Sequence, residues 1–167
     1  MRSQQGFSLV ETVFALGILL IVALGLLPLG MIATTTTENQ GHLSARTTEY
    51  AQDKLEQLLA LAYGDTTSDT RVFPAGDLGG SGLTPGGSFD PDVPVDLYVD
   101  YLDINGSLLD ADAGDEPTGW FYKRVWAISV PSLNLKQVTV TATVRTAVGG
   151  IGVVPQSTVT ALKTFPF

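Results

Sequence analysis

The segment from Val13 to Ala33 contains no charged residue and consists only of apolar side chains, glycine and proline. As an α-helix, at about 1.5 Å per residue, it would be roughly 31 Å long. The hydrocarbon core of a bilayer is about 30 Å thick, so a helix of this length can cross it. The rest of the chain is polar and rich in Gly, Thr and Asp. The sequence therefore predicts one membrane-spanning helix joined to a polar domain.

Composition excludes several functions. The 167 residues carry a formal net charge of −8, contain no cysteine and include a single histidine, His42. Disulfides, thiolate metal sites and cysteine nucleophiles are therefore excluded, and the acidic balance argues against a broad grip on nucleic acid. The sequence has no G-x-S-x-G motif, phosphate loop or Rossmann glycine pattern. We therefore expect no enzymatic activity, no cofactor and no nucleic-acid partner.

The N-terminus does not resemble an ordinary secretory signal. Such a signal has a shorter apolar stretch, closed by a small-x-small cleavage site. Here the apolar run is too long, and it begins beside an acid, Glu11. The short polar segment Met1–Gly6 comes first and carries one positive side chain, Arg2. Cleavage between Gly6 and Phe7 would create a new α-amino group four residues before Glu11.

A carboxylate at the edge of a membrane span is costly and usually has a partner. The new amine of Phe7 would supply a cation that pairs with Glu11 between staggered neighbouring helices. In a low-dielectric setting the Coulomb attraction is large, and the pairing would also fix the axial register of the subunits. The alternative is an uncleaved signal anchor, with Glu11 in the headgroup region.

The run Gly6-Phe7-Ser8-Leu9-Val10-Glu11, followed by the apolar stretch, resembles the prepilin signature of type IV pilins and type II secretion pseudopilins. The resemblance implies that a membrane prepilin peptidase cuts after Gly6 and methylates Phe7, and that Glu11 contacts a neighbour's N-terminus during assembly. Pro28 matches the helix proline of that family. The order of residues from Leu9 to Ile18 resembles PilV-like minor pilins and pseudopilin-I-like proteins more than it resembles major pilins.

From this resemblance we expect a minor pilin, a structural subunit of a type IV pilus. Its partners would be other pilins or pseudopilins, the inner-membrane assembly platform and, before assembly, membrane lipid. A pseudopilin of a type II secretion system is the alternative, and a single-pass anchored surface binding protein is a third. Arg2 precedes the span and the acidic domain follows it, so the positive-inside rule predicts a cytoplasmic N-terminus and an exported domain. The protein would lie in the inner membrane and then in a filament.

The resemblance and the residue pattern together predict three segments: a leader over 1–6, one long helix over 7–62 and an exported β-rich domain over 63–167. The helix contains the membrane span (13–33) and an amphipathic part (43–62). The amphipathic part places Ala51, Leu55, Leu58 or Leu59, and Ala62 on one face, with acids and amides between them and with Lys54 flanked by acids.

Two further features of the helix can be predicted. Gly64 should terminate it. Pro28 removes one intrahelical hydrogen bond and should kink the helix. The family resemblance adds a second interpretation of Pro28, namely local melting that lets the helix stretch in a filament.

After an irregular loop rich in Gly and Pro (64–94), the alternation of apolar and polar residues predicts an antiparallel sheet of about four strands packed on the amphipathic helix. The class is α+β, of the type IV pilin-like kind. The expected strands are 95–101, 120–130, 135–145 and 153–165, with a short hairpin arm at 107–109 after the Asn105-Gly106 turn and a turn at Gly149-Gly150.

Two polar groups in this domain have competing interpretations. The acidic residues of 110–116 offer oxygen ligands that suit calcium, but their spacing is not that of an EF-hand, and a solvated loop explains them equally. The aromatic and basic residues Trp120, Tyr122, Lys123 and Arg124 could form a nucleic-acid patch, but strand alternation accounts for the same residues.

Overall fold

The computed structural model describes residues 8–110, 116–146 and 153–165. Gly6 and Phe7, the acidic residues 111–115 and the expected Gly149-Gly150 turn lie outside the described residues. The chain divides into two compact units, one up to Asn39 and the other from Gln40 onward. A single helix, α1 (Leu9–Ala60), contributes to both units.

In the first unit, α1 is the one helix of the described residues that is long and apolar enough to cross a membrane. The helix continues through Pro28 without interruption. The four threonines that follow the apolar run are compatible with the apolar interior of a membrane. The hydroxyls of Thr34 to Thr37 donate hydrogen bonds of 2.8–3.1 Å to carbonyls one turn earlier, so these polar groups need no water.

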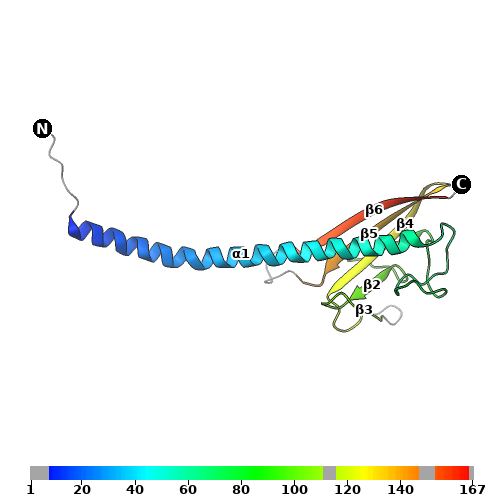
Figure 1. Cartoon of the computed structure of the whole chain (residues 1–167), viewed down its shortest axis with the longest axis horizontal. Helices are drawn as coiled ribbons and strands as arrows, with labels where there is room; N and C mark the ends of the chain where they lie inside the picture. Colours follow the sequence, from blue (N-terminus) through cyan, green and yellow to red (C-terminus); the bar gives the residue numbers. More distant parts are fainter. Residues whose placement is uncertain (1–7, 111–115, 147–152, 166–167) are drawn as a thin grey trace. The chain divides into compact units, whose positions relative to one another are not determined.

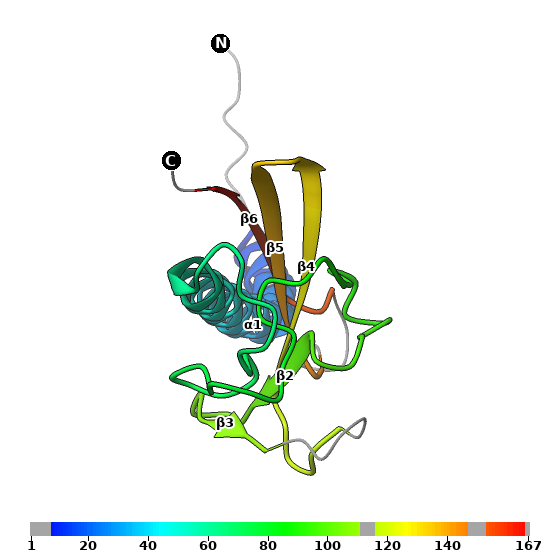
Figure 2. The same ribbon diagram turned by 90° about the vertical axis from the view of Figure 1, so that its right-hand side faces the viewer.

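The second unit contains a six-stranded antiparallel sheet (Figures 1 and 2). Its main path runs β3-β2-β4-β5-β6, and β1 pairs with β4. The strands are β1 (Gly86–Gly87), β2 (Val99–Leu102), β3 (Leu108–Leu109), β4 (Tyr122–Ser132), β5 (Leu135–Val144) and β6 (Gln156–Thr164). The predicted α+β fold, a long helix against an antiparallel sheet, is confirmed.

The core lies between one face of this sheet and the part of α1 that follows Gln40. The apolar positions predicted for β5 are confirmed, because Val138, Val140 and Ala142 are all fully buried; the alternation itself ends after Thr139, since Thr141 and Thr143 are buried as well. Leu58 of α1 and Trp126 of β4 are fully buried in the same cluster. The helix ends at Ala60, so Ala62, which was expected on its buried face, lies beyond it and is exposed.

The prediction that a strand begins at residue 95 was wrong, since β2 begins only at Val99. Leu97 has a left-handed backbone (φ 68°), and its N–H donates to the Asp96 carboxylate at 2.8 Å. The N–H of Tyr98 donates to the Val95 carbonyl at 3.0 Å. A turn at Asp96 therefore replaces the first half of the predicted strand, because aspartate side chains bond readily to nearby backbone N–H groups.

The loop 64–94 was expected to have little regular structure; within it, the Gly86-Gly87 pair forms the short strand β1 beside β4. Gly87 has φ +81°, and a Cβ at this position would collide with the Trp126 carbonyl. Only glycine allows the loop backbone to approach β4 so closely.

The C-terminal end of α1 carries no basic residue of its own in its last turn. Lysines from the sheet supply the positive charge at this end of the helix. Lys163 of β6 donates to the Leu59 carbonyl at 2.6 Å. Lys136 of β5 donates to the Tyr63 and Leu83 carbonyls at 2.7 and 2.8 Å. The Leu59 and Tyr63 carbonyls lie at and just beyond the helix end, so the two lysines satisfy them there. Their positive charges also interact favourably with the negative end of the helix dipole. Both contacts fasten the end of α1 to the sheet.

Candidate functional site

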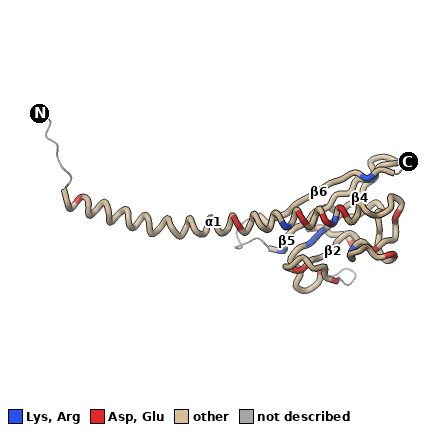
Figure 3. The backbone as a smooth tube through the Cα atoms, in the orientation of Figure 1, with Lys and Arg blue, Asp and Glu red and all other residues tan. Residues whose placement is uncertain are grey.

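The first candidate site is the surface of α1 before Asn39. Every large apolar side chain from Leu9 to Ile32 is exposed, from 49% for Val22 to 80% for Leu9. Between Glu11 and Glu38 there is no charge (Figure 3). This charge-free stretch, Thr12 to Thr37, is about 39 Å long. Exposed apolar surface of this extent needs a cover of lipid or protein, because soluble proteins rarely leave patches of more than a few hundred Å² in water.

Glu11 stands in the first turn of α1, where the partial positive charge of a helix N-terminus favours a carboxylate. Its neighbour Thr12 is held locally, since the Thr12 hydroxyl donates to the Leu9 carbonyl at 2.8 Å. The structure thus places Glu11 at the start of the charge-free surface and Pro28 within it. Gly6 and Phe7 lie outside the described residues, so their distance from Glu11 is not part of the observed geometry.

Residues 1–27 match the description "Prokaryotic N-terminal methylation motif". This segment contains Gly6, Phe7 and Glu11 and joins the apolar part of α1. Over these residues the chain is similar to type IV pilins and pseudopilins. The family is structural and non-enzymatic. Its motif implies processing by prepilin peptidase and assembly with pilins. No curated protein matches the chain, and no solved structure does either.

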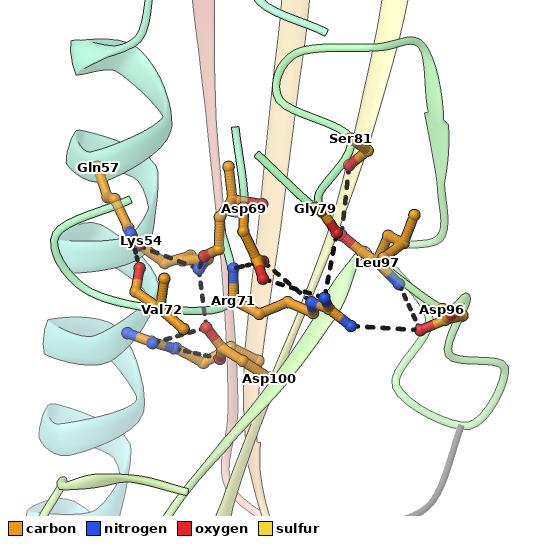
Figure 4. A network of polar contacts seen from close by, with 12 residues as sticks. Lys54, Gln57, Asp69, Arg71, Val72, Gly79, Ser81, Asp96, Leu97 and Asp100 are labelled. Carbon is orange, nitrogen blue, oxygen red and sulfur yellow. Dashed lines mark hydrogen bonds and ion pairs between the residues drawn. The ribbon is translucent and has the colours of Figure 1, made fainter. Parts of the chain in front are cut away.

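A second polar centre of this pilin-like chain was missed by sequence reasoning. Lys54 is flanked by acids in the sequence, yet its side chain is fully buried between α1 and the sheet. Its Nζ lies 2.8 Å from the carboxylate of Asp100 on β2. The same carboxylate accepts two hydrogen bonds from Arg124 of β4, at 2.7 and 2.8 Å. We call these three residues the buried triad; Figure 4 labels two of them, Lys54 and Asp100.

The loop after α1 is tied to the triad. The Lys54 ammonium also donates to the Thr70 carbonyl and to the Gln57 side chain, and Gln57 in turn donates to the Val72 carbonyl at 2.6 Å. The ammonium lies 4.1 Å from the ring centroid of Trp126, in a cation–π arrangement. Lys54 therefore joins helix, sheet and loop at one point.

The triad holds two cations and one carboxylate, and the pKa values follow from this. Burial lowers the pKa of Lys54 to about 8, although the Asp100 carboxylate opposes the shift. Burial raises the pKa of Asp100, but Arg124 and Lys54 outweigh that effect and hold it below its usual range. Asp100 is therefore the anion that allows two buried cations to coexist.

Of the two interpretations of the aromatic and basic residues near Trp120, the structure supports strand alternation and not a nucleic-acid patch. Lys123 and Arg124 point to opposite faces of β4: Lys123 pairs with Glu116 at 2.6 Å, and Arg124 pairs with Asp100. Tyr122 is buried against Tyr50, with ring centroids 4.8 Å apart. These side chains therefore stabilise the domain and do not present a basic surface.

Most of the acidic segment 110–116, for which a calcium site and a solvated loop were the competing interpretations, lies outside the described residues. Among the residues that are described, no group of three or more His, Cys, Asp or Glu side chains is placed to hold a metal ion.

We predict that Asp100→Asn destabilises the domain by about 3–5 kcal/mol, because it leaves two buried cations without their anion. Urea unfolding of the detergent-solubilised full chain, followed by tryptophan fluorescence, measures the change. Asp53→Asn is the matched control, since Asp53 is exposed on the same helix. Equal midpoints for the two variants would contradict a structural role for the triad.

The pKa of Lys54 also predicts a pH dependence. The folded chain releases the Lys54 proton near pH 8, whereas the unfolded chain keeps it to about pH 10.5. The unfolded state therefore binds more protons in this window, so the unfolding free energy should rise between pH 7.5 and 9.5, by ~2 kcal/mol at most. Lys54→Met should remove this rise. An identical pH profile in wild type and variant would show that Lys54 is not the titrating group.

Proposed function

We propose that the chain is a minor pilin, a structural subunit of a type IV pilus that matures by cleavage after Gly6 and N-methylation of Phe7. The observation that carries the proposal is the methylation motif over residues 1–27, continuous with a helix surface on which Glu11 is the only charge before Glu38. A structural subunit of this kind needs a surface that lipid covers first and neighbouring helices cover later. The charge-free stretch of α1 has that chemistry.

In this proposal Glu11 selects the position of each new subunit. Within a bundle of apolar helices, an unpaired carboxylate costs several kcal/mol, and so does an unpaired amine. Pairing Glu11 with the N-terminal amine of Phe7 on a neighbour removes both costs. Because the dielectric is low there, the attraction is strong at contact. The pair would therefore hold subunits in one axial register.

Pro28 has a separate proposed role. Proline lacks an N–H, so the helix has one hydrogen bond fewer there than at any neighbouring residue. If α1 lengthens in a filament, this turn is where separation costs least. We propose that any stretching is concentrated near Pro28.

The proposed location is the inner membrane, with Arg2 and the N-terminus on the cytoplasmic side and the domain exported, followed by the filament. The inner-membrane assembly platform would pass the chain from one to the other. Deleting the gene distinguishes the two candidate machines. Loss of surface pili supports a minor pilin, whereas loss of protein secretion with normal pili supports a type II secretion pseudopilin.

The cleavage proposal predicts the N-terminal mass of the protein purified from its native membrane. We expect a chain that starts at N-methylated Phe7, and we expect this form to disappear when prepilin peptidase is deleted. A chain that starts at Met1 in both strains would contradict the proposal and favour a simple anchored surface protein.

For Glu11→Ala, we expect normal cleavage but at least about tenfold less protein in assembled filaments, as for the loss of ~1.4 kcal/mol or more of subunit affinity. Immunoblots of sheared filaments and membranes measure both quantities. Glu38→Ala is the matched control, because Glu38 is the next charge along α1. Equal incorporation of the two variants would show that Glu11 does not act in assembly.

A further inference from the structure

A cavity of about 620 Å³ lies between the second half of α1, the loop that follows it and the β2–β3 hairpin. We call it the hairpin cavity. Its walls are mostly apolar and include Ala60, Phe73, Leu102 and Leu108. All of these residues belong to the second compact unit of the chain. The volume falls within the range of about 300–1,000 Å³ that is typical of ligand pockets, so the cavity has the size and the lining of a binding site.

One buried cation faces this cavity. Arg124 is only 8% exposed, and its Nε and Nη2 both donate to the Asp100 carboxylate. Its third nitrogen, Nη1, has no partner among the described residues. Nη1 is not sealed inside the protein, because the fully enclosed unpaired side-chain atoms of the described chain belong only to Thr70 and Trp126. Arg124 lines the hairpin cavity, so its free N–H groups are available to an acceptor bound there.

The mouth of the hairpin cavity is acidic. Asp53 and Glu56 line it from an exposed face of α1. Within the described chain, neither carboxylate forms an ion pair. Free carboxylates repel an anion and attract a cation, so this mouth favours a ligand with a positive group. The acceptor that reaches Arg124 is then best a neutral one, such as a peptide carbonyl.

Phe73 lines the same cavity, and its side chain is 80% exposed. The loop that carries it is closed on both sides. Asp69 and Gly76 exchange two backbone hydrogen bonds of 2.9 Å, and Gln57 of α1 donates to the Val72 carbonyl at 2.6 Å. An exposed aromatic ring on a fixed backbone is typical of an interface anchor, because a partner can bury the ring without having to order the loop.

The described part of this chain offers no unengaged cation that could enter the hairpin cavity of a second copy. Its lysines and arginines each contact a carboxylate, a backbone carbonyl or an aromatic ring: Arg46, Lys54, Arg71, Lys123, Arg124, Lys136, Arg145 and Lys163. The occupant is therefore expected on a different protein. In the proposed filament, the neighbouring proteins are other pilins.

We propose that the hairpin cavity binds a peptide segment of another filament subunit, in which an apolar side chain lies beside a lysine or arginine. The apolar side chain packs on the apolar walls and against Phe73. The free N–H groups of Arg124 donate to a backbone carbonyl of the segment, and Asp53 and Glu56 pair with its cation. The choice of a filament subunit as partner rests on the proposed function, whereas the chemistry of the segment rests on the cavity alone.

Three capped peptides test this chemistry on the detergent-solubilised full chain, with binding measured by saturation-transfer NMR. They are acetyl-Ala-Leu-Lys-Ala-amide, the same peptide with Glu in place of Lys, and the same peptide with Ser in place of Leu. We expect the Leu-Lys peptide to bind about fivefold more tightly than the Leu-Glu peptide, because exposed ion pairs are weak. It should bind about tenfold more tightly than the Ser-Lys peptide, which lacks the apolar side chain.

Two pairs of variants locate the binding. Asp53→Asn with Glu56→Gln should remove the preference for Lys over Glu but keep the preference for Leu over Ser. Asp92→Asn with Glu38→Gln is the matched control, because it removes the same two charges from exposed positions that do not line the hairpin cavity. The same detergent is present throughout, so peptide binding to micelles cancels.

The aromatic anchor is tested separately. Phe73→Ala should weaken binding of the Leu-Lys peptide about threefold or more, by loss of an aromatic contact. Phe89→Ala should leave it unchanged, since Phe89 is also exposed but does not line this cavity.

Equal binding of the three peptides would overturn the proposal, and so would a charge preference that survives in the Asp53→Asn, Glu56→Gln chain. Tighter binding of the Leu-Glu peptide would overturn it as well, because Arg124 would then be taking a carboxylate. The N-terminal mass of the native protein is measured in parallel. A chain that starts at Phe7 but shows no peptide preference contradicts the cavity site alone. A chain that prefers the Leu-Lys peptide but is never cleaved after Gly6 contradicts the proposed function, and with it the filament partner.

Discussion

The charge-free surface of α1 must be covered by lipid or by protein, and the rest of this protein depends on that constraint. From Thr12 to Thr37 the helix offers no charge, and the hydroxyls at its far end are satisfied by the helix itself. Lipid can cover such a surface, and so can the same surface on neighbouring subunits. The free-energy difference between these two covers is small, because neither exposes apolar groups to water. That near balance suits the proposed subunit, which would leave a membrane and enter a filament.

The second half of the same helix is held by buried charged contacts. There the buried triad of Lys54, Asp100 and Arg124 fixes α1 to β2 and β4 through charge-assisted hydrogen bonds. A purely apolar contact would tolerate sliding of the helix along the sheet, whereas a triad with fixed geometry does not. Lysines from β5 and β6 then hold the helix end.

Sequence patterns predicted the parts of this chain that depend on local periodicity. A charge-free run identifies a span, the alternation of Val138, Val140 and Ala142 identifies β5, and a six-residue signature identifies the motif. The burial of Lys54 could not be predicted, because its partners Asp100 and Arg124 are distant in the sequence and lysine on a helix is usually solvated. The turn at Leu97 could not be predicted for a different reason. An aspartate side chain can bond to nearby backbone N–H groups in place of strand pairing, and the alternation of apolar and polar residues does not tell which of the two forms.

We propose that the surface of α1 exchanges lipid for neighbouring subunits. The most direct measurement is quantitative mass spectrometry of the Phe7-starting chain in sheared filaments and in membranes, from strains with and without the inner-membrane assembly platform. The account predicts that the chain appears in filaments only when the platform is present and accumulates in the membrane when it is absent. A chain that stays entirely in the membrane in both strains would contradict the account.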